Sequence, residues 1–201
     1  MSSNQPVAKP RASRGGARNA LLVATLETIA ADGVDAVTHR RVAEVAGVSP
    51  GSATYHFSSR QDLIRAALAY WMDLADQVID RLDAEMRTSA VTPRERVREV
   101  LCGVVGEAFA YERFVRAEYE MILFASTDEE LAADLRRRES RWVGTLAADL
   151  EEAGAVRSVE IARILVNTTR GFDLERLTNP RLGVDDLRHR LDVILNALLP
   201  D

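Results

Sequence analysis

The segment Gly47–Phe57, GVSPGSATYHF, concentrates side chains that recognise other molecules through hydrogen bonds. It holds two serines, one threonine, one tyrosine and one histidine, together with two glycines and one proline. Hydroxyl and imidazole groups donate and accept hydrogen bonds, and glycine lets a partner come close to the backbone. These residue types in one short stretch favour a polar recognition surface.

Catalytic chemistry finds little support in the chain. Its single cysteine, Cys102, stands among Leu101, Gly103 and Val104 on an apolar face, and the three histidines (39, 56 and 189) lie neither at metal-ligand spacing nor beside a candidate nucleophilic serine. The sequence therefore favours a protein that is not an enzyme and needs neither a cofactor nor a metal.

Composition favours an all-α protein whose N-terminal third attracts polyanions. Hydrophobic residues make up 47% of the 201 positions, and the alternation typical of strands is scarce. The net charge is −5, yet residues 1–65 hold eight basic and five acidic residues, so they carry +3 and the remainder −8. A lone cysteine cannot form an internal disulfide, and no N-terminal apolar stretch resembles a signal sequence or membrane span, so we expect a cytoplasmic protein without membrane contact.

Two short helices position the recognition segment. The first runs from about Thr38 to Ala46, and Gly47 ends it. Ser49 is placed to cap the next helix, whose first position suits Pro50 because that proline lacks an N–H group. Six residues of this helix are expected to face outward: Pro50, Gly51, Ser52, Thr54, Tyr55 and His56.

Longer amphipathic helices account for the rest of the chain. They are expected over about residues 17–32, 60–87, 93–109, 112–125, 128–153, 158–178 and 184–199. Capping-box patterns at Thr92–Glu95 and Thr127–Glu130 open two of them. Two short helices joined by a glycine turn have the geometry that places a recognition helix in the DNA major groove, but ordinary helical bundles show the same spacing.

The residues themselves favour the DNA-binding interpretation, because this stretch resembles the signature of the TetR family of transcriptional regulators. The matching positions are Thr38, Val42, Ala43, Ala46, Gly47, Val48, Ser49, Gly51, His56, Phe57, Arg60 and Leu63. Two positions depart from the family pattern. Thr54 stands where the family commonly has tyrosine, and Arg60 where lysine is commoner. Tyr55 follows Thr54 but points about 100° away on a helix, so it does not replace that contact.

The resemblance implies an architecture and a mode of action. Residues 1–16 are expected to be a flexible basic arm, 17–65 a three-helix helix-turn-helix domain with its motif at about 38–57, and 66–201 a helical domain for ligand binding and dimerisation. Family members bind a palindromic operator as homodimers, and a small-molecule effector releases them. Repression is their usual mode. The segments resembling the dimerisation helices are about 128–153 and 158–178.

The resemblance also implies roles for single residues. Arg40 and the outward residues of the third helix would read base edges, whereas Thr38, Thr54, His56 and Arg60 would hold the sugar-phosphate backbone, with Ser49 on the same rim. For Arg40 a plain solvated charge remains an alternative. His56 could equally cap or pack within its own domain.

A possible effector site is lined by aromatic and polar residues of the C-terminal part. These are Trp71, Phe109, Phe114, Tyr119, Trp142, Asn167, Arg170 and Asp173. Aromatic residues at helical spacing also occur as plain core. Asn167 and Asp173 would need a partner if they faced inward, and a ligand, Arg170 or a second subunit could supply it.

A second function class remains open, namely a helical interaction protein that kept the fold without sequence-specific DNA binding. Salt dependence separates the two, because phosphate contacts make DNA affinity fall steeply with added salt.

Overall fold

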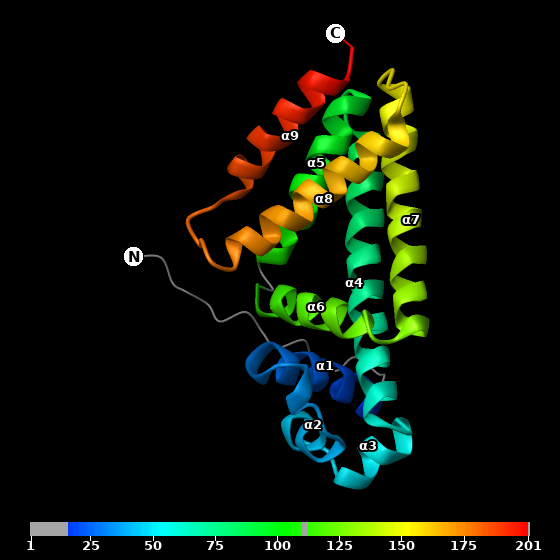
Figure 1. Cartoon of the computed structure of the whole chain (residues 1–201), viewed down its shortest axis with the longest axis vertical. Helices are drawn as coiled ribbons and strands as arrows, with labels where there is room; N and C mark the ends of the chain where they lie inside the picture. The colour runs from blue at the N-terminus through cyan, green and yellow to red at the C-terminus, as the bar shows by residue number, and fades with distance from the viewer. Residues whose placement is uncertain (1–15, 110–111, 201) are drawn as a thin grey trace. The chain divides into compact units, whose positions relative to one another are not determined.

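The computed structural model describes residues 16–109 and 112–200, with only the backbone described for Phe109 and Glu112. The predicted arm at 1–16 therefore lies almost wholly outside the described residues. Over the described ranges the chain forms helices and no strand, which confirms the all-α class (Figure 1). The elements are α1 (Gly16–Asp32), the 3₁₀ helix η1 (Val34–Ala36), α2 (His39–Ala46), α3 (Pro50–His56), α4 (Arg60–Thr88), α5 (Pro93–Phe109), α6 (Glu112–Ala125), α7 (Glu129–Glu152), α8 (Ser158–Arg176) and α9 (Val184–Leu198).

The chain divides into two units, Met1–Tyr70 and Trp71–Asp201, and the division falls inside α4. In the first unit α1 packs on η1, α2 and α3. Its core includes apolar side chains that are no more than 2% exposed: Leu21, Leu22, Leu26, Ile29, Val37, Val42, Ala43, Ala53, Phe57, Leu63 and Ile64. Burial of these apolar surfaces fixes the short helices, which would be marginal in isolation.

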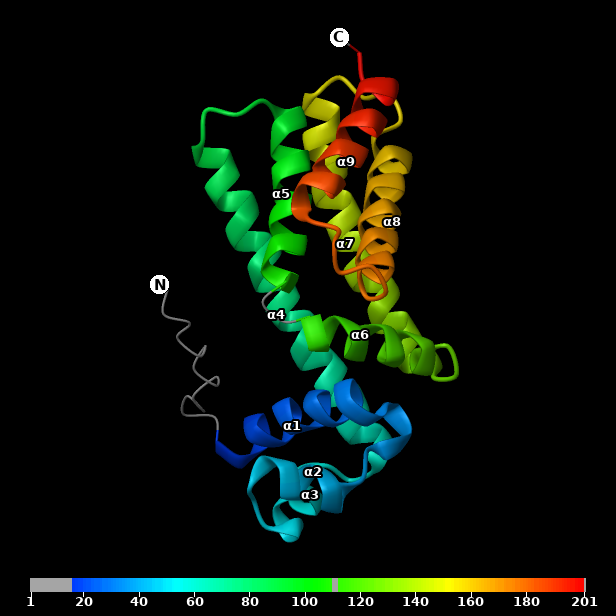
Figure 2. The ribbon, with the colours of Figure 1, turned by 90° about the vertical axis from the view of Figure 1, so that its left-hand side faces the viewer.

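The second unit is a helical bundle in which α5, α7, α8 and α9 share one core (Figure 2). Each helix contributes an apolar stripe, and the largest members include Leu101, Leu146, Leu150, Leu165, Phe172, Leu187, Leu191 and Leu195. The predicted helix boundaries for this part agree with the structure to within two residues, and the largest difference is at α8, which ends at Arg176.

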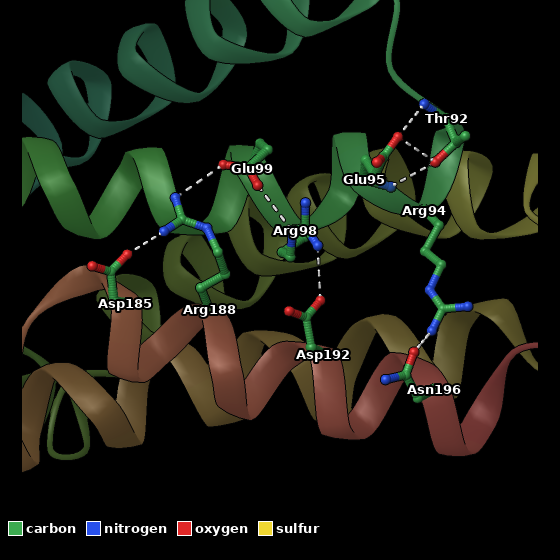
Figure 3. Close-up of polar contacts among 9 residues, drawn as sticks. All are labelled: Thr92, Arg94, Glu95, Arg98, Glu99, Asp185, Arg188, Asp192 and Asn196. Carbon is green, nitrogen blue, oxygen red and sulfur yellow. Dashed lines mark hydrogen bonds and ion pairs between the residues drawn. The ribbon is translucent and has the colours of Figure 1, made fainter.

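Polar contacts fix α9 alongside α5 (Figure 3). Arg98 Nη1 donates to Asp192 at 2.9 Å, and Arg188 Nη2 donates to Glu99 at 3.2 Å. At the start of α5 the predicted capping box is present, since Thr92 N and Oγ1 both donate to Glu95 Oε2 at 2.8 Å. Elsewhere on α9, Val193 and Leu198 are exposed.

The N-terminus of α7 differs from the prediction. Asp128 is its cap and accepts from the N–H of Leu131 at 3.2 Å, whereas Thr127 Oγ1 donates back to the carbonyl of Phe124 at 2.8 Å. A carboxylate is the stronger acceptor for a free helix amide, and so the helix begins one residue later than the Thr127 pattern predicts.

Ion pairs join α4 to its neighbours in the second unit. Asp149 of α7, only 1% exposed, accepts from Arg87 at 2.9 Å and from Arg96 at 2.7 Å. Farther along, Arg138 of α7 donates to Asp73 at 2.6 Å and to Asp76 at 2.8 Å. Two guanidinium groups balance the buried Asp149 charge, which would otherwise be costly. Over the described part of the chain, none of the helices combines the length and apolar character needed to cross a bilayer.

Candidate nucleic-acid interface and effector site

The turn between α2 and α3 follows directly from its sequence. Gly47 ends α2 in the left-handed conformation with φ 67°, which glycine adopts without a Cβ clash. Ser49 Oγ then accepts from the N–H of Ser52 at 3.3 Å, and Pro50 occupies the first position of α3. The prediction of both features from the sequence is confirmed, and together they set where α3 begins.

Helix α3 has one buried side and one open side. Ala53 is fully buried and Phe57, just after the helix, is 2% exposed. On the other side Pro50, Gly51, Thr54 and Tyr55 are exposed, and Tyr55 reaches 83%. Ser52 and His56, which we also expected to face outward, are half-buried. The open side is therefore polar and narrow.

Gly51 stands out on that open side. A Cβ built at this position meets no atom within 4 Å, and its backbone is ordinary helix. Nothing within the described fold therefore requires glycine here. A residue that weakens a helix without a local reason indicates that another molecule approaches closely.

The rim of α2 presents further polar groups. Thr38 caps α2 by accepting from the N–H of Arg41 at 3.1 Å, and it remains exposed. Arg40 is also exposed, whereas Arg41 is tied to Asp32 by an ion pair. Of the two neighbouring arginines, Arg40 is thus the one whose surroundings leave it available to a ligand.

Arg60 holds the fold of its own unit. Its Nε donates to the carbonyl of Val37 at 3.1 Å, and its Nη2 donates to the carbonyl of Val34 at 2.7 Å and to Asp35 at 3.2 Å. His56 stacks edge-on against Tyr55 with ring centroids 5.0 Å apart. Arg60 and His56 were both predicted to contact the sugar-phosphate backbone of DNA. In the structure both side chains make contacts within the protein.

A second cluster of polar and aromatic groups lies in the second unit, on α4, α6 and α8. We call it the Trp71 cluster, and it comprises Trp71, Phe114, Glu118, Tyr119 and Asp173. The indole N–H of Trp71 donates to Glu118 Oε2 at 2.8 Å, and the rings of Trp71 and Phe114 have centroids 5.6 Å apart. Tyr119 donates its hydroxyl hydrogen to the carbonyl of Arg170 at 2.6 Å, which places α6 against α8 one turn before Asp173.

Burial raises the pKa of both carboxyl groups of the Trp71 cluster. For Asp173 the pKa is raised to about 7, with Arg176 opposing the effect of burial and the charge of Glu118 adding to it. Burial also raises the pKa of Glu118, although the Trp71 hydrogen bond opposes the shift. Asp173 Oδ1 is buried and accepts no hydrogen bond from the described residues, and Arg176 Nε lies 3.8 Å from it. Arg176 is therefore the cationic partner of Asp173, although the two groups form no hydrogen bond.

Models of two known protein regions match this chain. Residues 21–67 match the model for bacterial regulatory proteins of the tetR family, and residues 92–201 match the tetracyclin repressor-like C-terminal domain. The chain belongs to the tetR family of bacterial regulatory proteins. It is therefore a TetR-family transcriptional regulator, and the matched N-terminal region contains the α2–α3 turn and the open face of α3.

Individual relatives agree with this family. The regulator BetI of Rhizobium meliloti (strain 1021) is 38% identical over 84 residues, which are 42% of this chain and 39% of BetI. The chain thus matches about two fifths of the length of its curated relatives. Among solved structures, a transcriptional regulator from Saccharomonospora viridis in complex with choline is 25% identical, with a TM-score of 0.76 over 92% of this chain and 98% of that one. A TetR-family regulator from Rhodococcus sp. is 27% identical, with a TM-score of 0.72 over 92% and 98%.

The other predicted effector-site residues of this TetR-family chain lie apart from the Trp71 cluster or in other contacts. Trp142 packs against the core shared by α5, α7, α8 and α9. Asn167 is exposed on α8, and Arg170 donates to Glu139 at 2.6 Å. The side chain of Phe109 lies outside the described residues. Of the predicted set, the structure brings together Trp71, Phe114, Tyr119 and Asp173.

Sequence reasoning missed two residues. Glu118 is not among the predicted residues, yet it accepts the hydrogen bond from the indole N–H of Trp71. His39 was considered only as a possible metal ligand, but its Nε2–H donates to the carbonyl of Phe57 at 3.0 Å and ties the start of α2 to the end of α3. The signal for Glu118 in the sequence is an acidic residue four positions after Phe114 and next to Tyr119 on one helix.

Large apolar side chains are exposed on the last two helices. They are Val159, Ile164 and Leu174 on α8 and Val193 and Leu198 on α9, and each is between 43% and 56% exposed. Along α8 the positions 164, 167, 171 and 174 follow a three–four spacing, so they form one stripe with Gly171 at its middle. A Cβ at Gly171 would meet no atom within 4 Å. None of the large apolar side chains found exposed in the described residues belongs to α7.

Proposed function

We propose that this TetR-family regulator is a dimeric repressor that binds a palindromic operator through α3 and leaves it when a small-molecule effector binds the second unit. The DNA-binding role is assigned to residues 17–65, and the effector and dimer roles to residues 66–201. The observation that carries the proposal is the open face of α3, where Gly51 has free space that the fold does not use.

The face of α3 matches the requirements of a major groove. A groove admits a helix whose protruding side is polar and unobstructed, and here small residues lead the helix while Tyr55 projects from it. We assign Tyr55 and Arg40, with the outward residues of α3, to base edges. Thr38, Ser49, Thr54 and His56 are assigned to sugar and phosphate.

Arg60 has a different proposed part. Because its guanidinium already donates to Val34 and Val37 carbonyls, its main contribution is to fix the η1 loop from which Thr38 and α2 start. It supports the phosphate-binding rim and can reach a phosphate only with the donors that these bonds leave over.

Dimerisation is expected because one helix-turn-helix buries too little DNA for tight specific binding. The exposed apolar stripe supports α8 and α9 as the helices that meet a second subunit. The sequence analysis expects dimerisation helices at 128–153 and 158–178. The present assignment retains the segment 158–178 and replaces the segment 128–153 with α9. Gly171 would let the two copies of α8 approach closely.

Effector control is supported by the second unit's Trp71 cluster and by a relative. The Saccharomonospora viridis regulator, solved in complex with choline, is similar to this chain over nearly its whole length. A ligand that binds one spacing of the two recognition helices better than the other shifts the population away from DNA.

The test is selection of DNA fragments of the source genome on the full-length protein, followed by electrophoretic shift titrations at several salt concentrations. The proposal predicts a palindromic sequence in the recovered fragments and an affinity that falls steeply with salt. Recovery of no enriched sequence would favour the alternative, a helical interaction protein without specific DNA binding.

A further inference from the structure

Arg18, in the first turn of α1, is an exposed cation whose hydrogen-bond donors no described residue uses. Its guanidinium carbon lies 5.4 Å from the centroid of the Phe57 ring. That contact engages the positive charge, and none of the described residues accepts a hydrogen bond from Arg18 or forms an ion pair with it. Arg60, by contrast, donates to backbone carbonyl groups of its own unit. Arg18 therefore keeps its N–H groups available to a ligand.

The ends of three segments meet at Phe57. Its ring lies against Arg18 from the start of α1, and its carbonyl is hydrogen-bonded to His39 Nε2, at the start of α2, at 3.0 Å. Phe57 itself directly follows α3. These contacts place Arg18 beside the end of α3 and close to the start of α2, where Thr38 and Arg40 are exposed. Arg18 thus borders the surface to which we assign DNA contacts.

The sequence before α1 adds charge of the same sign. Lys9, Arg11 and Arg14 precede Arg18, and no acidic residue occurs before Glu27. Such a run of cations attracts a polyanion, and double-stranded DNA carries one negative charge for about every 1.7 Å of its axis. A guanidinium group with free donors can bind two oxygens of one phosphate. The charge and the free donors of this segment therefore match the DNA backbone.

We propose that Arg18, with the basic segment that precedes it, binds the phosphate backbone of DNA next to the half-site that α3 contacts. The inference rests on the proposed DNA-binding function and adds to it a contact that carries no sequence information. Base reading is left to α3, because Arg18 contacts Phe57 after the end of that helix and not the open face. The contact raises the affinity for all DNA sequences alike and makes binding more sensitive to salt.

The test measures how the affinity of the full-length protein for a selected operator depends on salt, by shift titration. Each phosphate contact contributes about 0.9 to the slope of log affinity against log salt concentration, so Arg18→Ala is expected to lower the slope by about two in a dimer. The affinity ratio between the operator and a variant with one base pair changed is expected to stay the same. A merely structural role of Arg18 would instead disturb α3 and change this ratio. Arg18→Lys keeps the charge and is expected to retain most of the slope.

Two further variants locate the contact. The triple variant Lys9→Ala, Arg11→Ala, Arg14→Ala is expected to lower the slope as well and to shorten the hydroxyl-radical footprint beside each half-site. It leaves Arg18 on Phe57, so the test remains valid if Arg18→Ala weakens the fold. Arg137→Ala is the matched control, because it removes one exposed cation from α7, where Arg137 pairs with Asp134, and it is expected to leave the slope unchanged.

The outcomes separate this inference from the function on which it rests. If an operator is selected and the slope is the same in the wild type, Arg18→Ala and the triple variant, the backbone contact is overturned and the repressor function stands. If no sequence is selected but the wild type binds DNA with a slope that Arg18→Ala lowers, the backbone contact stands and the sequence-specific function falls. A changed affinity ratio with an unchanged slope in Arg18→Ala would also overturn the inference.

Discussion

Gly47 and Gly51 lie four residues apart around the start of α3, and only Gly47 is required by its own backbone. Gly47 has φ 67°, whereas Gly51 has an ordinary helical conformation and open space where a Cβ would stand. The two glycines therefore separate the folding role of Gly47 from the binding role that we propose for Gly51.

Gly51→Ala is expected to raise the free energy of unfolding by roughly 0.5–1 kcal/mol, because alanine loses less backbone entropy in a helix. The same change is expected to weaken operator binding, since the new methyl group meets the DNA. Urea unfolding and shift titrations measure the two effects. Gly47→Ala serves as the control and is expected to lower stability by about 1–2 kcal/mol. A Gly51→Ala protein that binds the operator like wild type would remove the close approach at this position.

Arg40→Ala and Tyr55→Ala are each expected to weaken operator binding by roughly 1–3 kcal/mol, the usual value of a good base contact. Both side chains are exposed, so stability should change little. Shift titrations on the selected operator and on variants with one base pair changed give the measurement. Thr54→Ala is the comparison, because loss of a phosphate contact weakens binding to all sequences alike. Retention of full specificity in Tyr55→Ala would contradict base reading by α3.

Ile164→Glu and Leu174→Glu are expected to convert the dimer into a monomer at micromolar concentration, because each places a charge within the exposed apolar stripe of α8. Sedimentation velocity measures the change. Ala148→Glu, an exposed position on α7, is the matched control and is expected to stay dimeric. Dissociation by Ala148→Glu with no effect of Leu174→Glu would place the interface on α7 instead.

The free energy of unfolding should depend on pH through the carboxyl group of Asp173. A carboxyl group whose pKa is raised on folding stabilises the protein while protonated, and this contribution is lost as pH rises from about 4 through 7. Relative to Asp173→Asn, the wild type is expected to lose on the order of 1–3 kcal/mol between pH 5 and pH 8. Urea unfolding at both pH values measures the difference, and parallel profiles would show that Asp173 does not titrate there.

Local rules account for much of the fold and of the proposed DNA-binding surface. Gly47, Ser49 and Pro50 predict the turn because each satisfies a backbone requirement within a few residues. The Thr92–Glu95 box is predicted for the same reason. At Thr127 the local rule was wrong, since two adjacent residues could cap α7 and the carboxylate of Asp128 did so.

These local rules do not predict contacts between helices that are far apart in the sequence. Glu118 meets Trp71 across 47 residues, and only the packing of α4 on α6 reveals it. Asn167 is a polar residue among apolar positions of α8. Its exposure could not be predicted, because it depends on which side of α8 packs against the neighbouring helices. The contacts of Arg60 likewise could not be predicted, because they depend on where the fold places the carbonyl groups of η1.

The central claim is that α3 of a dimer reads DNA, and footprinting of the full-length protein on a fragment selected from the source genome tests it most directly. The account predicts protection of two half-sites with centres about 34 Å apart along the helix axis, related by a palindrome. It also predicts that Tyr55→Ala loses this protection while remaining dimeric. Unchanged protection of both half-sites in each of the two variants, Tyr55→Ala and Gly51→Ala, would contradict the claim.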